Sequence, residues 1–190
     1  MFGWGKKRAL TAAQQLQTAR WRCDRCDAEH GWPLDLAAHA PDPWHGAADD
    51  EHNGALRYDG DFLSEDFCVL DGTYFMVRAV LQIPVRDAAG DFGFGCWSTL
   101  SRENFDKYVM GFDSGTYEDM GPWSGWLCNQ LADFVGTDPL GVWVQPRPNR
   151  QRPLLWVTDD AHPLAIAQED GITAERILEI FQFYGHCPNG

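Results

Sequence analysis

The chain has 190 residues, of which 44% are hydrophobic and 13% aromatic, a composition typical of a folded domain and not of a disordered segment. The formal net charge is −13, and residues 1–22 contain five basic residues and no acid, so the rest of the chain carries −18. Such a body repels a phosphate backbone, and no stretch approaches the roughly 20 apolar residues of a membrane span, so we expect neither nucleic acid nor a membrane as partner.

The length suits one domain with its own hydrophobic core. We therefore expect a single domain over residues 1–190, in which residues 1–10 form a flexible tail. These first residues contain no apolar run long enough for a signal peptide. Six cysteines in a chain without such a signal indicate reduced thiols and a cytoplasmic location.

The early part of the chain predicts few regular elements. Residues 11–20 favour a short helix, because Thr11 and Gln14 have the spacing of a capping box. Residues 33–60 contain repeated Pro and Gly and are expected to be irregular.

The middle of the chain predicts a tight β-hairpin. Residues 67–70 and 73–83 are rich in strand-forming residues. Asp71 and Gly72 between them supply the positive φ angles that a two-residue hairpin turn requires.

A second hairpin leads through residues 86–91 into a strand over residues 92–100. In that strand Gly93 and Gly95 share one face, which indicates a bulge or another segment packed close to the strand. A nucleotide-binding loop is the alternative, but no helix follows directly and no phosphate-loop motif is present.

The C-terminal half predicts both helices and strands. Ser101 caps a helix with one apolar stripe, formed by Phe105, Tyr108, Val109 and Phe112. Thr173 caps a last helix with the inward-facing residues Ile177, Ile180, Phe181 and Tyr184. Residues 111–125 are loop-like, residues 123–134 fit a strand or a helix, and residues 141–145 and 154–158 predict strands.

Together these elements predict the fold class. Strands joined by hairpins and flanked by a few helices define an α+β fold with a mainly antiparallel sheet. Its N-terminal part, residues 21–32, is expected to form a turn like that of a zinc knuckle.

The cysteine pair in residues 21–32 predicts a zinc site. Two residues separate Cys23 from Cys26, a spacing that lets one tight turn direct both sulfurs at one ion, and His30 follows as a third ligand. A structural zinc ion needs four ligands, and Cys68 at the start of the first hairpin is our choice for the fourth. The rivals for these positions are His39, His45, His52, His162, His186 and Cys187.

Two other interpretations of the cysteine pair remain open. It could be a redox dithiol, although no thioredoxin-like βαβ pattern surrounds it, or a pair of incidental free thiols. Asp27 follows Cys26 where zinc knuckles prefer Gly, but Asp tolerates the left-handed region better than most residues.

Catalytic interpretations are weaker. Cys68, Cys96 and Cys128 are candidate nucleophiles with His162, but no spacing pairs them, and lone cysteines in apolar surroundings are usually buried hydrophobic residues. Asp159, Asp160 and His162 follow a predicted strand end, where a turn is favoured over an active site.

The chain also resembles an uncharacterised bacterial family, known as domain of unknown function 2199. The matching segments include C-D-R-C-D-A-E-H, D-F-C-V-L-D-G-T-Y-F-M-V-R-A-V-L-Q-I-P-V, F-G-F-G-C-W-S-T-L-S-R-E-N-F, G-W-L-C-N-Q-L, R-P-L-L-W-V and H-P-L-A-I-A-Q-E-D-G-I-T. The resemblance implies no activity. The residues that match its motifs include Cys23, Cys26, His30, Cys68 and His162.

Three functions are consistent with these patterns. The first is a cytoplasmic, zinc-stabilised binding or interaction domain without catalysis. The second is an immunity-type or inhibitory protein that binds a basic partner, because acidic surfaces speed association and aromatic residues anchor it. The third is a metal- or cysteine-dependent enzyme that uses His162, Asp160 and one cysteine. The sequence leaves the oligomeric state open.

Overall fold

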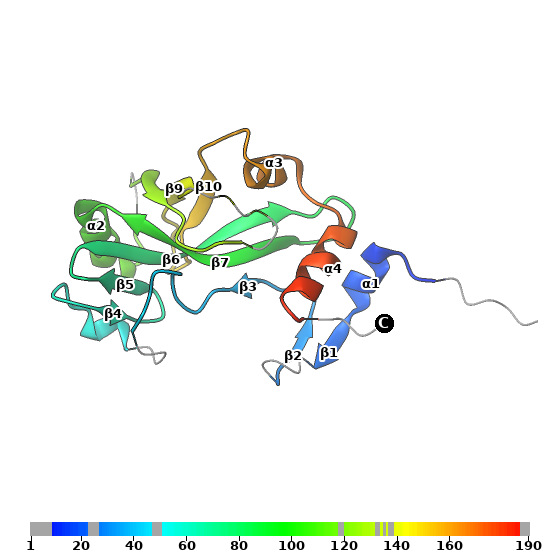
Figure 1. Cartoon of the computed structure of the whole chain (residues 1–190), viewed down its shortest axis with the longest axis horizontal. Coiled ribbons are helices and arrows are strands. Elements are labelled where there is room, and N and C mark those ends of the chain that lie inside the picture. The colour runs from blue at the N-terminus through cyan, green and yellow to red at the C-terminus, as the bar shows by residue number, and fades with distance from the viewer. Residues whose placement is uncertain are drawn as a thin grey trace, which may run out of the picture.

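The computed structural model describes residues 9–22, 27–46, 51–117, 120–131, 134, 136 and 139–186. Within these ranges, helices surround one large sheet, and a small two-stranded sheet lies at one end (Figure 1). The helices are α1 (Ala12–Thr18), α2 (Arg102–Phe112), α3 (Pro163–Asp170) and α4 (Ala174–Phe183), with a 3-10 turn η1 (Asn53–Ala55). None of the helices in the described part of the chain is long and apolar enough to cross a membrane.

The strands confirm the predicted α+β class. They are β1 (Arg20–Arg22), β2 (Glu29–Gly31), β3 (Leu36–Ala37), β4 (Phe62–Leu63), β5 (Phe67–Leu70), β6 (Tyr74–Pro84), β7 (Asp91–Leu100), β8 (Trp123–Trp126), β9 (Gly141–Gln145) and β10 (Leu154–Val157). β1 and β2 form the small sheet, and the large sheet has the order β3-β7-β6-β10-β9-β8. Most pairings are antiparallel, but β3 with β7 and β10 with β6 are parallel, so the sheet is mixed.

The large sheet curls until its strands meet again. One edge of β6 pairs with β7, and its other edge is shared by β5 and β10. β8, at the far end of the sheet order, returns to β7: Leu127 forms an antiparallel bridge with Ser98, and the Cys128 N–H donates to the Trp97 carbonyl over 2.8 Å. The strands β7, β6, β10, β9 and β8 therefore form a closed cycle of pairings.

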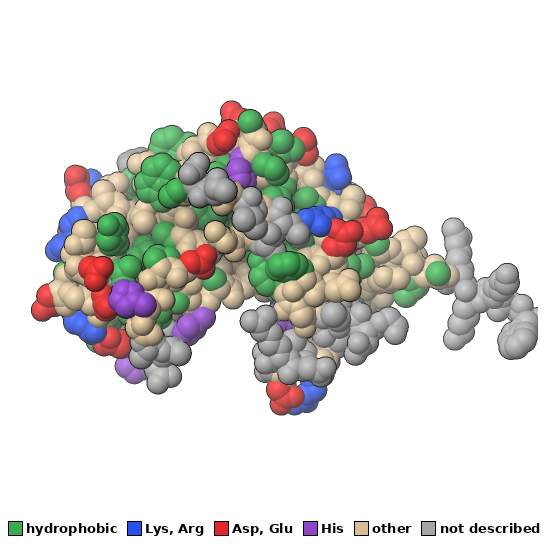
Figure 2. Space-filling model, viewed as in Figure 1, with side chains coloured by type: hydrophobic (Ala, Val, Ile, Leu, Met, Phe, Trp, Pro, Cys, Tyr) green, Lys and Arg blue, Asp and Glu red, His purple; other side chains and the backbone are tan. Residues whose placement is uncertain are grey.

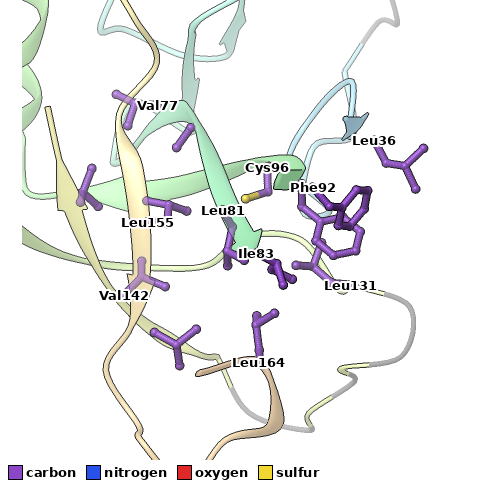
Figure 3. Close-up of a cluster of buried hydrophobic side chains, with 14 of the residues drawn as sticks. Leu36, Val77, Leu81, Ile83, Phe92, Cys96, Leu131, Val142, Leu155 and Leu164 are labelled. Atoms are coloured by element: carbon purple, nitrogen blue, oxygen red, sulfur yellow. The ribbon is translucent and has the colours of Figure 1, made fainter. Parts of the chain in front are cut away.

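The core fills the interior of this cycle. Alternate residues of β6 point inward, and Val77, Leu81 and Ile83 are fully buried. They meet side chains from β7, β9 and β10 and from α3, as Figure 3 shows for Phe92, Val142, Leu155 and Leu164. Because side chains alternate along a strand, the inward-facing residues of β6 all contribute to this common core.

The second hairpin strand shows why glycine occupies two positions on one face. A Cβ atom at Gly93 would lie 2.7 Å from a carboxylate oxygen of Asp35, and one at Gly95 would lie 2.9 Å from the Cβ of Ala37. Both neighbours belong to the segment around β3, which pairs with this part of β7. The expectation that another segment packs close to these glycines is confirmed.

Several local predictions are confirmed in detail. Asp71 and Gly72 have φ angles of 53° and 62°, as the predicted hairpin turn requires. Thr11 and Gln14 form the capping box of α1, and Ser101 and Thr173 cap α2 and α4 with their side-chain oxygens.

Other segments differ from the sequence expectation. Residues 21–32 are not only a turn, because β1 and β2 pair there as a short antiparallel hairpin. Helix α3 was not predicted, although Pro163 occupies its first turn. Residues 33–60 are largely irregular as expected, apart from β3 and η1.

One buried amide ties the strand cycle to the loop after β3. Asn129 is nearly fully buried, and its Oδ1 accepts the Trp97 N–H over 2.8 Å. Its Nδ2 donates to the Ala40 carbonyl over 3.0 Å and to Asp42 Oδ1 over 2.9 Å. The backbone N–H of the neighbouring Gln130 donates to Asp42 Oδ2 over 2.7 Å.

We predict that Asn129→Ala lowers the free energy of unfolding by about 2–4 kcal/mol, because it leaves buried polar groups without partners. Urea unfolding of the full chain measures this. The matched control, Gln130→Ala, keeps its backbone hydrogen bond and is expected to change stability by less than about 0.5 kcal/mol. Equal effects of the two substitutions would contradict a structural role for the Asn129 amide.

Candidate functional site

The β1–β2 hairpin carries the predicted cysteine pair. Trp21 pairs with His30 and Arg22 with Glu29, so residues 23–28 connect the two strands. Cys23 and Cys26 lie outside the described residues.

An exposed ion pair spans the base of the hairpin loop. Arg22 donates from Nε to Asp27 Oδ1 over 2.6 Å and from its terminal nitrogen to Asp27 Oδ2 over 2.8 Å. This guanidinium lowers the pKa of the Asp27 carboxyl. Asp27 itself has a φ angle of 54°. It thus adopts the left-handed conformation that Gly adopts more readily, at the position where zinc knuckles prefer Gly.

His30 lies against a histidine from the other end of the chain. The rings of His30 and His186 meet edge to face, with their centroids 5.4 Å apart and their planes at 87°. His186 follows α4, which packs beside α1 above the β1–β2 hairpin (Figure 1). The structure therefore brings His30, the predicted third zinc ligand, next to His186, which the sequence offered as an alternative ligand.

Cys68 lies elsewhere in the fold. It is fully buried on β5, in a second apolar cluster with Leu63, Leu70, Met76 and Trp97. Burial, with a smaller effect from nearby Cys128, raises the pKa of its thiol to about 12. β5 and the β1–β2 hairpin lie in separate parts of the molecule (Figure 1), so the structure does not bring Cys68 to His30. The set Cys23, Cys26, His30 and Cys68 stays a prediction, since two of its members lie outside the described residues.

The molecule is hollowed between the large sheet and the N-terminal lobe, which α1, β1 and β2 form (Figure 2). The pocket there has a volume of about 600 Å³. Its lining includes His30, His39, His186, Asp35 and Tyr184. Three imidazoles and the carboxylates of Asp35 and Asp42 line this pocket, so it gathers groups that can bind metals or exchange protons.

A second pocket, of about 690 Å³, adjoins the first one across Asp42 and Asn129. Its lining includes Cys128, one of the three cysteines that the sequence offered as a nucleophile, and His162, the base offered with them. His162, however, caps α3, and its Nδ1 accepts the Leu164 N–H over 3.1 Å. The favoured interpretation of this segment as a turn fits that role.

The three cysteines on or beside the large sheet are poor nucleophiles. Burial raises the pKa of the thiols of Cys68, Cys96 and Cys128 to about 12 in each case. Only a small fraction of each is the reactive thiolate near neutral pH.

The structure also shows a group that sequence reasoning missed. His45, Asp61 and Asp71 place ligand atoms within 4.8 Å of one another. His45 Nε2 lies 3.6 Å from Asp61 Oδ2, and Asp61 Oδ1 accepts the Asp71 N–H at the hairpin turn. The group lies at the surface and holds this turn, so it defines no site by itself.

Three tryptophans form a second region of interest, which we name the tryptophan face. Trp126 on β8, Trp143 on β9 and Trp156 on β10 are 55%, 46% and 43% exposed. Trp143 is directly opposite Trp156 in the β9–β10 pairing. Figure 2 shows hydrophobic side chains gathered at the surface over β9.

The tryptophan face follows from strand alternation. Val142, Val144, Leu155 and Val157 point into the core, so the residues between them point outward. Gly141 lies opposite Trp126, and a Cβ atom at Gly141 would lie 2.6 Å from Thr158 Oγ1. This glycine leaves the face without a side chain beside Trp126.

The fold and these regions define an α+β domain with a mixed, curled sheet and an N-terminal lobe. The family model described as "Uncharacterized protein conserved in bacteria (DUF2199)" matches residues 22–172. The chain belongs to this family, which confirms the resemblance seen in its motifs. No curated protein and no solved structure matches the chain.

We predict that Cys68, Cys96 and Cys128 of the native protein react slowly with an alkylating reagent at pH 8. Raising a thiol pKa from 9.0 to about 12 lowers its thiolate fraction at this pH roughly 1000-fold. The rate should therefore keep rising with pH well beyond pH 9. Mass spectrometry of labelled peptides measures each cysteine, with urea-unfolded protein as the control. If any of the three cysteines is labelled as fast as in unfolded protein, its thiol is not a buried group with a raised pKa.

Proposed function

We propose that this chain is a cytoplasmic, zinc-stabilised binding domain without catalytic activity, whose tryptophan face contacts a positively charged protein partner. The observation that carries the proposal is the outward direction of three tryptophans on adjacent strands. An indole buries a large area when a partner covers it, and tryptophans are frequent anchors of protein interfaces.

The sequence charge argues for a positively charged partner. The chain carries a net charge of −13, and a body of that sign attracts basic proteins and speeds their encounter. Aromatic anchors then supply short-range affinity, while the charge supplies the on-rate and the discrimination against acidic proteins.

The local geometry of the β1–β2 hairpin supports the proposal that a zinc ion binds there. Asp27 has the left-handed backbone of a knuckle turn, and its ion pair with Arg22 closes the base of the loop that holds Cys23 and Cys26. His30 lies on the strand that leaves this loop. A short two-stranded sheet buries little surface and is marginal without an additional constraint, which a metal ion provides.

The chemistry of the body supports a function without catalysis. The buried thiols have raised pKa values, and His162 is engaged as a helix cap. A cysteine-dependent reaction needs a thiolate beside a free base.

A second candidate function is an immunity-type or inhibitory protein that neutralises a basic enzyme or toxin. The combination of strong negative charge with a tryptophan face favours it, since such proteins associate fast and dissociate slowly. It differs from the first candidate in that binding must abolish an activity of the partner.

For the metal, we predict about one equivalent of zinc in reduced protein purified without added zinc. Cys23→Ser should lower the content to well below half an equivalent, because a zinc ion loses one of its thiolates. Cys128→Ala, outside the hairpin, is the matched control and should keep the zinc. Elemental analysis measures both, and wild-type protein with under about half an equivalent would refute the zinc proposal.

For the tryptophan face, we predict that the double substitution Trp143→Thr and Trp156→Thr weakens partner capture at least about tenfold. Threonine suits the strand, so the sheet is retained. The measurement is affinity capture from lysate at low and moderate salt, with mass spectrometry of the captured proteins. Met110→Gln, which changes an exposed apolar residue on α2, is the control. Capture that is insensitive to the double substitution, or a partner of acidic charge, would contradict the proposal.

A further inference from the structure

We infer that His186 is a ligand of the hairpin zinc ion, in the place that sequence reasoning gave to Cys68. The ion is then held by Cys23, Cys26, His30 and His186, and it joins the N-terminal hairpin to the end of the last helix. This inference rests on the proposed zinc site and goes beyond the family match, which ends at residue 172.

The separation of the two rings fits a shared tetrahedral ion. An imidazole nitrogen lies about 2.0–2.1 Å from zinc, which places the ring centre about 3.2 Å from the ion and two such rings about 5.2 Å apart. The observed centroid separation of His30 and His186 is 5.4 Å. Two neutral imidazoles and two thiolates also balance the charge of Zn²⁺ and satisfy its preference for nitrogen and sulfur.

The position of His186 is set by the end of α4. Gly185 has a φ angle of 77°, which turns the chain back, and the His186 N–H donates to the Phe181 carbonyl over 2.8 Å. Phe181 is fully buried, and its ring lies 5.9 Å from that of Phe92 on β7. The ring of His186 is thus held by a helix end that is anchored in the core.

The surroundings of Cys68 argue against the competing assignment. Its cluster is apolar, the burial of the thiol disfavours the thiolate that a zinc ligand must be, and β5 lies away from the hairpin. His30 and His186, in contrast, lie in the wall of the same pocket.

The test uses the full chain under reducing conditions, with Zn²⁺ for affinity and Co²⁺ as the spectroscopic probe. We expect His186→Ala to weaken Zn²⁺ binding more than about 100-fold, since losing even an outer-shell contact costs 10–100-fold. His186→Cys should keep tight binding and raise the thiolate-to-Co²⁺ charge-transfer absorbance by about half, because three thiolates replace two.

Two controls separate the possible results. Cys68→Ala and His45→Ala should leave both the affinity and the Co²⁺ spectrum unchanged. If wild-type protein binds metal but His186→Cys leaves the charge-transfer band unchanged, or Cys68→Ala abolishes binding, His186 is not a ligand and the zinc proposal stands. If wild-type protein binds neither metal, the zinc proposal itself fails, and this inference with it.

Discussion

Ten consecutive residue pairs join β6 to β7, and this long hairpin is the frame on which the large sheet is built. They run from Phe75 opposite Leu100 to Pro84 opposite Asp91. β5 and β10 divide the remaining edge of β6, while β3 and β8 meet the remaining edge of β7. A shift of one residue would turn the buried face of β6 toward solvent, so the burial of Leu81 and Ile83 holds the register.

The two candidate regions use this frame in different ways. The tryptophan face belongs to the frame itself, because β9 and β10 direct aliphatic residues inward and Trp143 and Trp156 outward. The histidine pair lies on elements added at the end of the frame, the β1–β2 hairpin and the turn after α4. A rigid sheet can present large side chains unaided, whereas a short hairpin needs a link to the body to hold a defined position.

Features with a local cause were predictable from the sequence. The Asp71-Gly72 turn and the caps at Thr11 and Ser101 each depend on side chains a few residues apart. The tryptophan face was also within reach, because G-V-W-V-Q and L-L-W-V show the alternation directly.

Features with a distant cause were not predictable. The parallel pairing of β10 with β6 joins segments separated by several elements, and no turn residue marks it. The same holds for His30 and His186, which meet only because α4 packs beside α1. Cys68 was chosen for its residue type, while its apolar surroundings depend on β4, β6 and β7.

The packing of α1 against α4 has a consequence during synthesis. Leu16 is fully buried, yet α1 precedes and α4 follows the other elements that the structure describes. During synthesis, the side chain of Leu16 on α1 therefore stays exposed until α4 has been made. In that interval the apolar side of α1 is open to other contacts, and the N-terminal lobe completes its packing only after α4 has been made.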